Sequence, residues 1–255
     1  MNITAVLSGF GVGAIVGMTG VGGGSLMTPL LISAFRLSPA LAIGTDLWFA
    51  AITKTVGSAS HHQAGHVEWR VVAWLLAGSL PASVATTSLM RLSGFAQGWS
   101  AALTLSLGIA LLVTALTVAY RHVWQGIGRR LERWIPVYRK GPVTLLCGVL
   151  LGVLVSMSSI GAGAIGATLI LLIHPRLGAH RVVGTDIAHA VPLTLVAGIG
   201  HAALGHVDWL LLGSLLAGSL PGIWLGAQLT RKVPERVVRS LLCVSLVVAG
   251  LKVIH

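Results

Sequence analysis

We predict an all-α, polytopic helical membrane protein made of two inverted repeats, each with a re-entrant or broken first helical hairpin followed by three transmembrane helices. Three observations predict this fold: an apolar composition, an internal duplication, and apolar runs of membrane-spanning length. The mean hydropathy is +0.90, 55% of the 255 residues are hydrophobic and only 9% are charged. Polar residues are too few to cover a soluble globule of this size, so the chain belongs in a bilayer.

An internal duplication divides the chain. Residues 44–81 recur at 184–221 without a gap, and 17 of the 38 aligned residues are identical. The repeated segments are GTD (Gly44–Asp46 and Gly184–Asp186), GHVEW or GHVDW, and LLAGSLP, always 140 residues apart. Two copies of one unit are the usual build of a membrane transporter whose site lies between the halves. We therefore predict a first transmembrane repeat at 1–119, a basic linker at 120–141 and a second repeat at 142–255.

The apolar runs give the predicted spans, since about 20 apolar residues cross a bilayer core. The spans are 3–35, 39–60, 71–91 and 99–119 in the first half, and 142–175, 181–203, 209–230 and 237–254 in the second. The first span of each half is too long for one crossing and contains glycines, in TGVGGGS (Thr19–Ser25) and SSIGAGA (Ser158–Ala164). Glycines weaken a helix and permit positive φ. Each first span is therefore predicted to be two half-helices that enter and leave on one side.

The basic residues orient the chain. The net charge is +11, and the linker holds much of it beside aromatic side chains: Arg121, Arg129, Arg130, Arg133, Arg139 and Lys140, with Tyr120, Trp124, Trp134 and Tyr138. Such a stretch is typical of an interfacial loop, and the positive-inside rule places it in the cytoplasm. Orientation and lipid contact account for this charge, so no nucleic-acid partner is expected.

Two further basic clusters test the re-entrant hairpins. Four simple crossings per half would put Arg176 and Arg181, and also the cluster at 231–239, outside the cell. A re-entrant hairpin followed by three crossings brings both clusters inside with the linker, as the positive-inside rule requires. Each half then crosses an odd number of times. The halves are therefore predicted to be inverted relative to one another, with both chain ends outside.

The glycine turns are the predicted binding region. Irregular backbone at membrane depth is tolerated only where it is buried in protein or lines a cavity. A half-helix that begins after Gly22–Gly24 directs unpaired N–H groups and the positive end of its dipole towards the membrane centre, and a second begins after Gly161 and Gly163. Such helix starts bind small anions. The alternative is close helix packing through small residues.

The first glycine motif resembles the signature of a known family. The pattern GxGGGSLxxPxL at Gly20–Leu31, followed by Ala42, Gly44 and Thr45, is similar to that of the TauE/SafE sulfite exporters, and the resemblance covers both halves. It implies a multi-pass protein of the cell inner (plasma) membrane that exports sulfite or organosulfonates, with the substrate near the paired glycine turns. The predicted substrate-binding residues are Gly20, Gly22, Gly23, Gly24, Ser25, Thr45, Gly161, Gly163 and Thr185. The second copy departs from the pattern at Ala162 and at Thr168, which stands in place of Pro29.

Four of the six acidic residues form two repeat-related pairs. Glu68 and Asp208 lie at predicted helix starts, where a carboxylate is an ordinary cap. Asp46 and Asp186 lie about two turns, roughly 10 Å, past their helix starts and therefore inside the bilayer. The TauE/SafE pattern leads us to expect an uncharged polar residue there. Carboxylates inside a membrane are functional candidates by default. Each either takes up a proton and couples transport to the proton gradient, or accepts from turn amides and supports the loop.

Other polar residues in the spans have two interpretations each. Lys54, eight residues after Asp46, either neutralises the anion or snorkels towards the cytoplasmic surface, and we favour snorkelling. His189 either bonds Asp186, three residues before it, or is a packed and satisfied core histidine, which we favour. Repeat-related histidines cluster near span ends: His61, His62 and His66, and His201 and His206. We predict these at the surface or at an interface, with no metal site, because a site needs three or four converging ligands.

Three function classes remain. The first is a secondary transporter for small sulfur oxyanions that works by alternating access of two inverted halves. The second is a cation or divalent-metal permease that uses Asp46, Asp186 and the histidines. The third is an intramembrane enzyme or a structural subunit, but GxSG, HExxH and paired catalytic aspartates in a usual spacing are absent, so we expect no enzyme and no cofactor. The expected partners are a small anionic substrate and lipid, and small-residue helix faces leave room for a homodimer.

Overall fold

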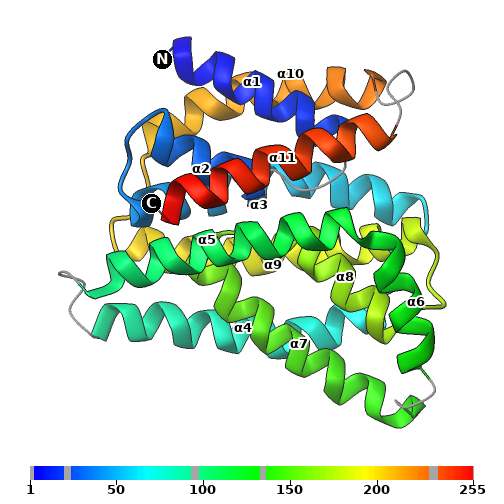
Figure 1. Cartoon of the computed structure of the whole chain (residues 1–255). Coiled ribbons are helices and arrows are strands. Elements are labelled where there is room, and N and C mark those ends of the chain that lie inside the picture. Colours follow the sequence, from blue (N-terminus) through cyan, green and yellow to red (C-terminus); the bar gives the residue numbers. More distant parts are fainter. Residues whose placement is uncertain (1–2, 20–23, 93–97, 133–135, 230–234, 255) are drawn as a thin grey trace.

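The computed structural model describes residues 3–19, 24–92, 98–132, 136–229 and 235–254. Within these residues the chain forms eleven helices and no strand (Figure 1). The helices are α1 (Ile3–Thr19), α2 (Gly24–Ser33), α3 (Pro39–Gln63), α4 (Trp69–Leu92), α5 (Gly98–Ala119), α6 (Arg121–Leu131), α7 (Val137–Ser158), α8 (Ala164–Ile173), α9 (Ala179–Ala203), α10 (Trp209–Leu229) and α11 (Glu235–Ile254). The predicted all-helical class is confirmed.

The long first span of each half is broken, as the glycines predict. Residues 3–35 give α1 and the ten-residue α2, and residues 142–175 give α7 and the ten-residue α8. Three helices follow each broken pair. Among the described residues, α4, α5, α7, α9 and α10 are long and apolar enough to cross a membrane, whereas α1, α8 and the apolar part of α11 are shorter. The chain is thus a multi-pass membrane protein.

The linker differs from its prediction. The stretch 120–141 was expected to be an interfacial loop, but α6 fills half of it and α7 begins before its end. Helix α6 packs against α8, where a Cβ at Gly128 would lie 2.8 Å from the Leu171 carbonyl oxygen. Trp124 packs against the buried core, whereas Tyr120 and Tyr138 are exposed. The helix within this stretch was not predicted, because Gly128 packs closely on a neighbour that sequence alone does not identify, and the linker bounds stay a prediction.

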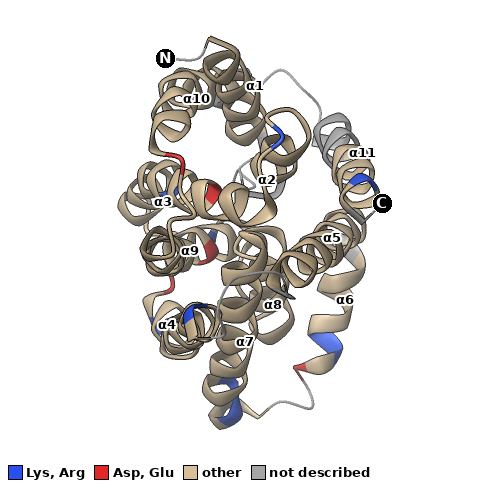
Figure 2. Ribbon diagram, turned by 90° about the vertical axis from the view of Figure 1, so that its left-hand side faces the viewer, with Lys and Arg blue, Asp and Glu red and all other residues tan. Residues whose placement is uncertain are grey.

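The two halves exchange packing partners rather than standing side by side. Helix α1 packs mainly on α10, and its repeat counterpart α7 packs on α4. Helices α3 and α9 pack on each other, as do α5 and α11. Figure 2 views the bundle with α3 and α9 between the α1–α10 and α4–α7 pairs. Each pair joins one helix of the first half to one of the second, so neither half is held together mainly by its own helices.

Contacts along the pairs give their directions. Gly9 faces Leu215 and Gly13 faces Ser219, so α1 and α10 run parallel. By contrast, Trp48 Nε1 donates to Gly198 O at 3.0 Å while Gly57 faces Ile187, so α3 and α9 run antiparallel. Helices α4 and α7 are also parallel and α5 and α11 antiparallel, because their contacts follow the same patterns. Two of the four pairs are therefore parallel and two are antiparallel.

The repeated LLAGSLP segment forms the joint between parallel helices. A Cβ at Gly218 would overlap the Val6 carbonyl oxygen, and one at Gly78 would overlap the Leu145 carbonyl oxygen. At these glycines the two backbones lie so close that no side chain would fit between them. Small residues permit such close packing between membrane helices. Each copy of the motif therefore packs against the first helix of the opposite half.

The repeated GTD and GHVEW or GHVDW segments also meet across the halves. The Asp208 N–H donates to Thr45 Oγ1 at 3.0 Å, and the Glu68 N–H donates to Thr185 Oγ1 at 3.0 Å. Gly44 lies against the His206 backbone in the first contact, as its counterpart Gly184 does against His66 in the second. Each threonine thus satisfies an N–H at the start of α10 or α4, a group that the helix itself leaves without a partner.

The buried core lies between the helices, and the outside is apolar. One cluster joins α3, α4, α7, α8 and α9, and a second joins α1, α2, α3 and α10 around Phe49. Large apolar side chains are exposed on the outer helices, among them Leu7, Ile109, Leu210 and Val248. Such a surface fits contact with lipid rather than water.

Candidate functional site

Two carboxylates lie deep in the bundle on the central helices. Asp46 of α3 and Asp186 of α9 have 0% and 2% of their surface exposed. The acidic segments of α3 and α9 lie in the interior in Figure 2. A charged carboxylate at such a place is costly unless it is paired or protonated, so its surroundings determine its role.

Asp46 is held against the half-helix of its own half. The buried Thr28 hydroxyl on α2 donates to Asp46 Oδ2. The Ser159 hydroxyl, at the end of α7, faces the same carboxylate. Among the described residues, however, Ser159 Oγ and Asp46 Oδ1 are both buried without a hydrogen bond of ordinary geometry. The carboxylate therefore joins α2 to α3 through one oxygen, while its other oxygen and the Ser159 hydroxyl have no hydrogen bond of ordinary geometry.

Asp186 has the corresponding place against α8. The Gly163 backbone acts on this carboxylate from the start of α8. Gly166, in the first turn of α8, approaches so closely that an added Cβ would overlap Asp186 Oδ1. In the described part of the chain, Oδ1 has no hydrogen-bond partner. Asp186 thus lies against the turn that starts α8, and both loop support and proton coupling stay predictions for it.

The turn between α7 and α8 depends on its glycines. Gly161 has φ 131° and Gly163 has φ 146°, which L side chains rarely adopt, and Ser159 is left-handed at φ 58°. Gly161 O accepts from the Gly166 N–H at 2.7 Å, and Gly163 O accepts from the Ala167 N–H at 2.8 Å. Gly161 and Gly163 thus shape the turn from which α8 starts.

The matching turn of the first half is described only in part. Gly20, Gly22 and Gly23 and the side chain of Ser25 lie outside the described residues, and Gly24 is the first residue of α2. The substrate contacts predicted for these five residues stay predictions. Thr45 and Thr185 are fully buried and accept from the starts of α10 and α4. Their observed role is to join the halves, and a substrate contact stays a prediction for them as well.

Lys54 connects the two halves of the site. Its Nζ donates to the Ala162 carbonyl in the α7–α8 turn at 2.6 Å, and only 6% of the residue is exposed. Its charge acts on both Asp186 and Asp46. The predicted snorkelling is therefore wrong. The broken helix supplies a carbonyl that no helical N–H takes, and the two carboxylates attract the ammonium inwards.

His189 packs next to this group without bonding Asp186. Its Nε2 shares a hydrogen bond with Ser79 Oγ of α4 at 2.9 Å, and the residue is fully buried. Within the described residues its Nδ1 has no partner. The expected core histidine is confirmed for one ring nitrogen, while the other adds one more unpartnered polar atom to the centre of the bundle.

The remaining histidines fall into two groups. His66 stacks on His180 and lies 5.8 Å from His61 between ring centroids. His201 Nε2 lies 2.8 Å from Ser156 O and the residue is fully buried, so of the two predicted positions it has the interface one, between α9 and α7. The described residues contain no group of three or more side chains able to hold a metal ion.

The predicted helix caps differ between the halves. Asp208 Oδ1 accepts from the Leu211 N–H at 2.9 Å and so caps α10 as expected. Glu68 instead places a carboxylate oxygen 3.6 Å from Arg181 at the start of α9. The pair thus combines one local cap with one ion pair between the halves.

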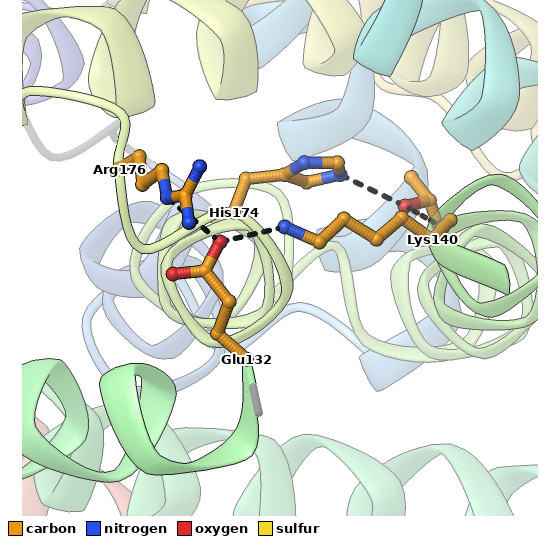
Figure 3. Close-up of polar contacts among 5 residues, drawn as sticks. Glu132, Lys140, His174 and Arg176 are labelled. Carbon is orange, nitrogen blue, oxygen red and sulfur yellow. Dashed lines mark hydrogen bonds and ion pairs between the residues drawn. The ribbon is translucent and has the colours of Figure 1, made fainter. Parts of the chain in front are cut away.

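A second polar cluster lies where α6, α7 and α8 meet (Figure 3). Glu132 Oε1 accepts from Lys140 at 2.9 Å and from Arg176 at 3.1 Å, and His174 shares a hydrogen bond with Thr144. The bond from Lys140 lowers the pKa of Glu132, and burial lowers the pKa of His174. Sequence reasoning missed this cluster because two of its contacts join distant positions, Thr144 with His174 30 residues later and Glu132 with Arg176 44 residues later.

Sequence reasoning also missed three groups, which contact Asp46, Lys54 and His189 respectively. Thr28 occupies a variable position of the glycine motif, Ala162 contributes only its carbonyl, and Ser79 lies one helix away in LLAGSLP. Only Ser79 carried a signal, since it belongs to a repeated segment. Its counterpart Ser219, however, bonds its own helix through Leu216 O.

Comparison with known proteins agrees with this architecture. Residues 5–253 match the family described as "Sulfite exporter TauE/SafE". The chain is 38% identical over 259 residues to "Probable membrane transporter protein YjnA" of Bacillus subtilis, and this alignment covers 100% of each protein. It is 27% identical over 246 residues to "Probable membrane transporter protein YdhB" of the same organism, covering 96% of this chain and 97% of that protein. No solved structure matches it.

The match spans both broken hairpins and all the helices that hold the central charges. Five of the described helices are long and apolar enough to cross a membrane, and the two relatives are named as membrane transporters. The chain therefore belongs to the TauE/SafE sulfite exporter family and is a multi-pass membrane transporter.

Proposed function

We propose that this protein is a secondary transporter that exports small sulfur oxyanions, sulfite or organosulfonates, across the inner membrane, with protons bound at Asp46 and Asp186. The observation that carries this proposal is the group of three buried charges on the central helices. Each carboxylate rests against the half-helix of its own half, and Lys54 acts on both. Ionisable side chains that face one another inside a membrane bundle mark ion pathways and proton relays.

The packing directions support two inverted halves. Counterpart helices that pack on each other, α3 with α9 and α5 with α11, run antiparallel, as helices related by an axis in the membrane plane must. Helices that are not counterparts, such as α1 and α10, run parallel. On this proposal the basic linker and α6 lie in the cytoplasm and both chain ends lie outside, because the positive-inside rule orients the two halves.

The family description and the half-helices support a small sulfur oxyanion as substrate. The matched family is described as sulfite exporters. Helix α8 starts at Ala164, directly after Gly163, so the positive end of its dipole lies at the central charges. A helix start and an ammonium both favour an anion.

A cation or divalent-metal permease is the competing function. Two carboxylates with unpartnered oxygens would suit a cation. Lys54 weighs against it, because its ammonium acts on both carboxylates and would repel a metal ion at the same place. We therefore favour the anion.

Uptake into proteoliposomes tests the proposal. Purified protein should take up labelled sulfite, and taurine or sulfoacetate should compete with it, whereas divalent metals should not move. Gly166→Ala should reduce uptake strongly because the new methyl group overlaps Asp186 Oδ1. Gly213→Ala on α10 is the matched control, since an added Cβ there meets nothing within 4 Å. Divalent-metal flux without sulfite flux would replace the proposal with the permease.

A further inference from the structure

We propose that Lys54 is the counter-ion of the transported anion, and that each monovalent anion binds together with one proton taken up by Asp46 and Asp186. This inference rests on the proposed function and deepens it, because it assigns the charge that holds the substrate and the number of protons that accompany it.

Lys54 is the one Lys or Arg side chain buried among the described residues. Its ammonium has three N–H donors, and in the described part of the chain the Ala162 carbonyl is its hydrogen-bond acceptor at 2.6 Å. Two donors therefore remain for a ligand. Its repeat counterpart is Thr194, whose hydroxyl donates within its own helix to Ala190 O at 2.8 Å. A single cation thus serves a site that both halves build.

Buried polar atoms without an ordinary hydrogen bond belong to the groups on which Lys54 acts. Asp186 Oδ1 and His189 Nδ1 have no hydrogen-bond partner among the described residues, and Asp46 Oδ1 and the Ser159 hydroxyl that faces this carboxylate have no hydrogen bond of ordinary geometry. The charge of Lys54 acts on the two aspartates and on His189. Buried polar groups are normally satisfied, and a cluster of exceptions indicates a place where a ligand or a proton belongs.

Charge counting then fixes the proton number. The ionisable groups that face one another from α3 and α9 are Asp46, Lys54, Asp186 and His189, and none is contributed by the described residues of α2 or α8. With His189 neutral, two carboxylates and one ammonium carry a net charge of −1. One proton brings this buried group to neutrality, which a low-dielectric interior strongly favours.

A bound monovalent anion changes that count by one. The anion takes the place of a carboxylate beside Lys54, so both carboxylates must then be protonated for the group to stay neutral. Loading the site therefore takes up one proton from the water phase to turn a carboxylate into a carboxylic acid. Anion and proton move together without net charge, and the direction of transport follows their combined gradients.

The test measures the affinity for the anion and the number of protons taken up on binding, with the purified full chain in detergent. The probe is sulfite at an acidic pH where it is the monoanion hydrogensulfite. Calorimetry gives the dissociation constant, and a pH indicator in weak buffer gives the proton uptake. The wild type should take up about one proton per anion. Asp46→Asn with Asp186→Asn, which keeps an acceptor for the Thr28 hydroxyl, should bind the anion without proton uptake.

Substitution of Lys54 tests the counter-ion. Lys54→Gln should weaken binding at least about 30-fold, since truncating one partner of a buried charge pair removes that much or more. Lys54→Arg should retain most of the affinity. Lys252→Gln, which removes an exposed cation from α11, is the matched control and should bind like the wild type. Circular dichroism and gel filtration confirm that each variant is folded.

The possible failures are distinguishable. If the wild type binds hydrogensulfite without proton uptake, or if folded Lys54→Gln binds it as tightly as the wild type, this inference is overturned and the proposed function survives. If the wild type binds no sulfur oxyanion at any pH, the proposed function fails, and the counter-ion role fails with it.

Discussion

Replacing Gly218 by alanine tests the joint between the halves. The added Cβ would lie 2.8 Å from the Val6 carbonyl carbon and 2.9 Å from the Phe10 nitrogen, and it would overlap the Val6 oxygen. Ordinary contact begins at 3.4 Å, so relief of the carbon contact alone separates α1 and α10 by about 0.6 Å, and relief of the closer oxygen contact separates them further. A gap of that size forfeits a quarter to a half of each dispersion contact along the seam. Overpacking of this kind costs about 1–3 kcal/mol.

Thermal unfolding in detergent measures this cost. A loss of about 1–3 kcal/mol lowers the apparent Tm by roughly 2–12 °C for a chain of this size. Gly213→Ala, on the same helix with open space around the new Cβ, should leave the Tm unchanged or raise it slightly. Equal stability of the two variants would refute the close packing of α1 on α10.

Three further predictions follow from other contacts. Thr45→Val and Thr185→Val should each destabilise the protein by about 1–3 kcal/mol, because each leaves an N–H of the opposite half unsatisfied, and equal stability of Val and Ser variants in thermal unfolding would contradict this. Glu132, whose pKa Lys140 lowers, contributes stability that is present above the ordinary glutamate pKa and is lost as the pH falls through the lower folded-state value, so Glu132→Gln should flatten the acid limb of the stability profile. A wild-type acid limb in that variant would exclude the contact. A reporter at the C-terminus should be active only outside the cytoplasm, and cytoplasmic activity would reject the inverted halves.

The broken first helices could be predicted from sequence because their signal is local. Spans 3–35 and 142–175 are too long for one crossing, and each contains glycines where the helix ends. The structure places the second break at Ser159–Gly163, within the predicted SSIGAGA segment. Length and backbone freedom are properties of the residues themselves, so no knowledge of neighbouring helices was needed.

The role of Lys54 could not be predicted in this way. Its position eight residues after Asp46 allows either an inward or an outward side chain. The choice depends on the Ala162 carbonyl, 108 positions away, which is available only because α7 and α8 are broken there. Burial of this charge is therefore a property of the assembled halves.

The repeated motifs have a structural role that the sequence did not reveal. The GT element was predicted to contact substrate, which stays a prediction, and Thr45 and Thr185 also accept from the backbone of the opposite half. A duplication shows that a segment is used twice, but not what it contacts. Here the halves exchange partners, so residues repeated for packing between the halves and residues repeated for binding look alike in sequence.

The measurement that tests the central claim most directly is labelled sulfite uptake into proteoliposomes under an imposed pH gradient. We expect wild-type protein to accumulate sulfite on the alkaline side, above the leak of protein-free liposomes, and accumulation to cease when the gradient is abolished. The paired Asp46→Asn and Asp186→Asn variant should still equilibrate sulfite but no longer respond to the gradient. Sulfite flux that ignores the gradient in the wild type, or a gradient response that persists in the paired variant, would contradict a proton-coupled anion site at these carboxylates.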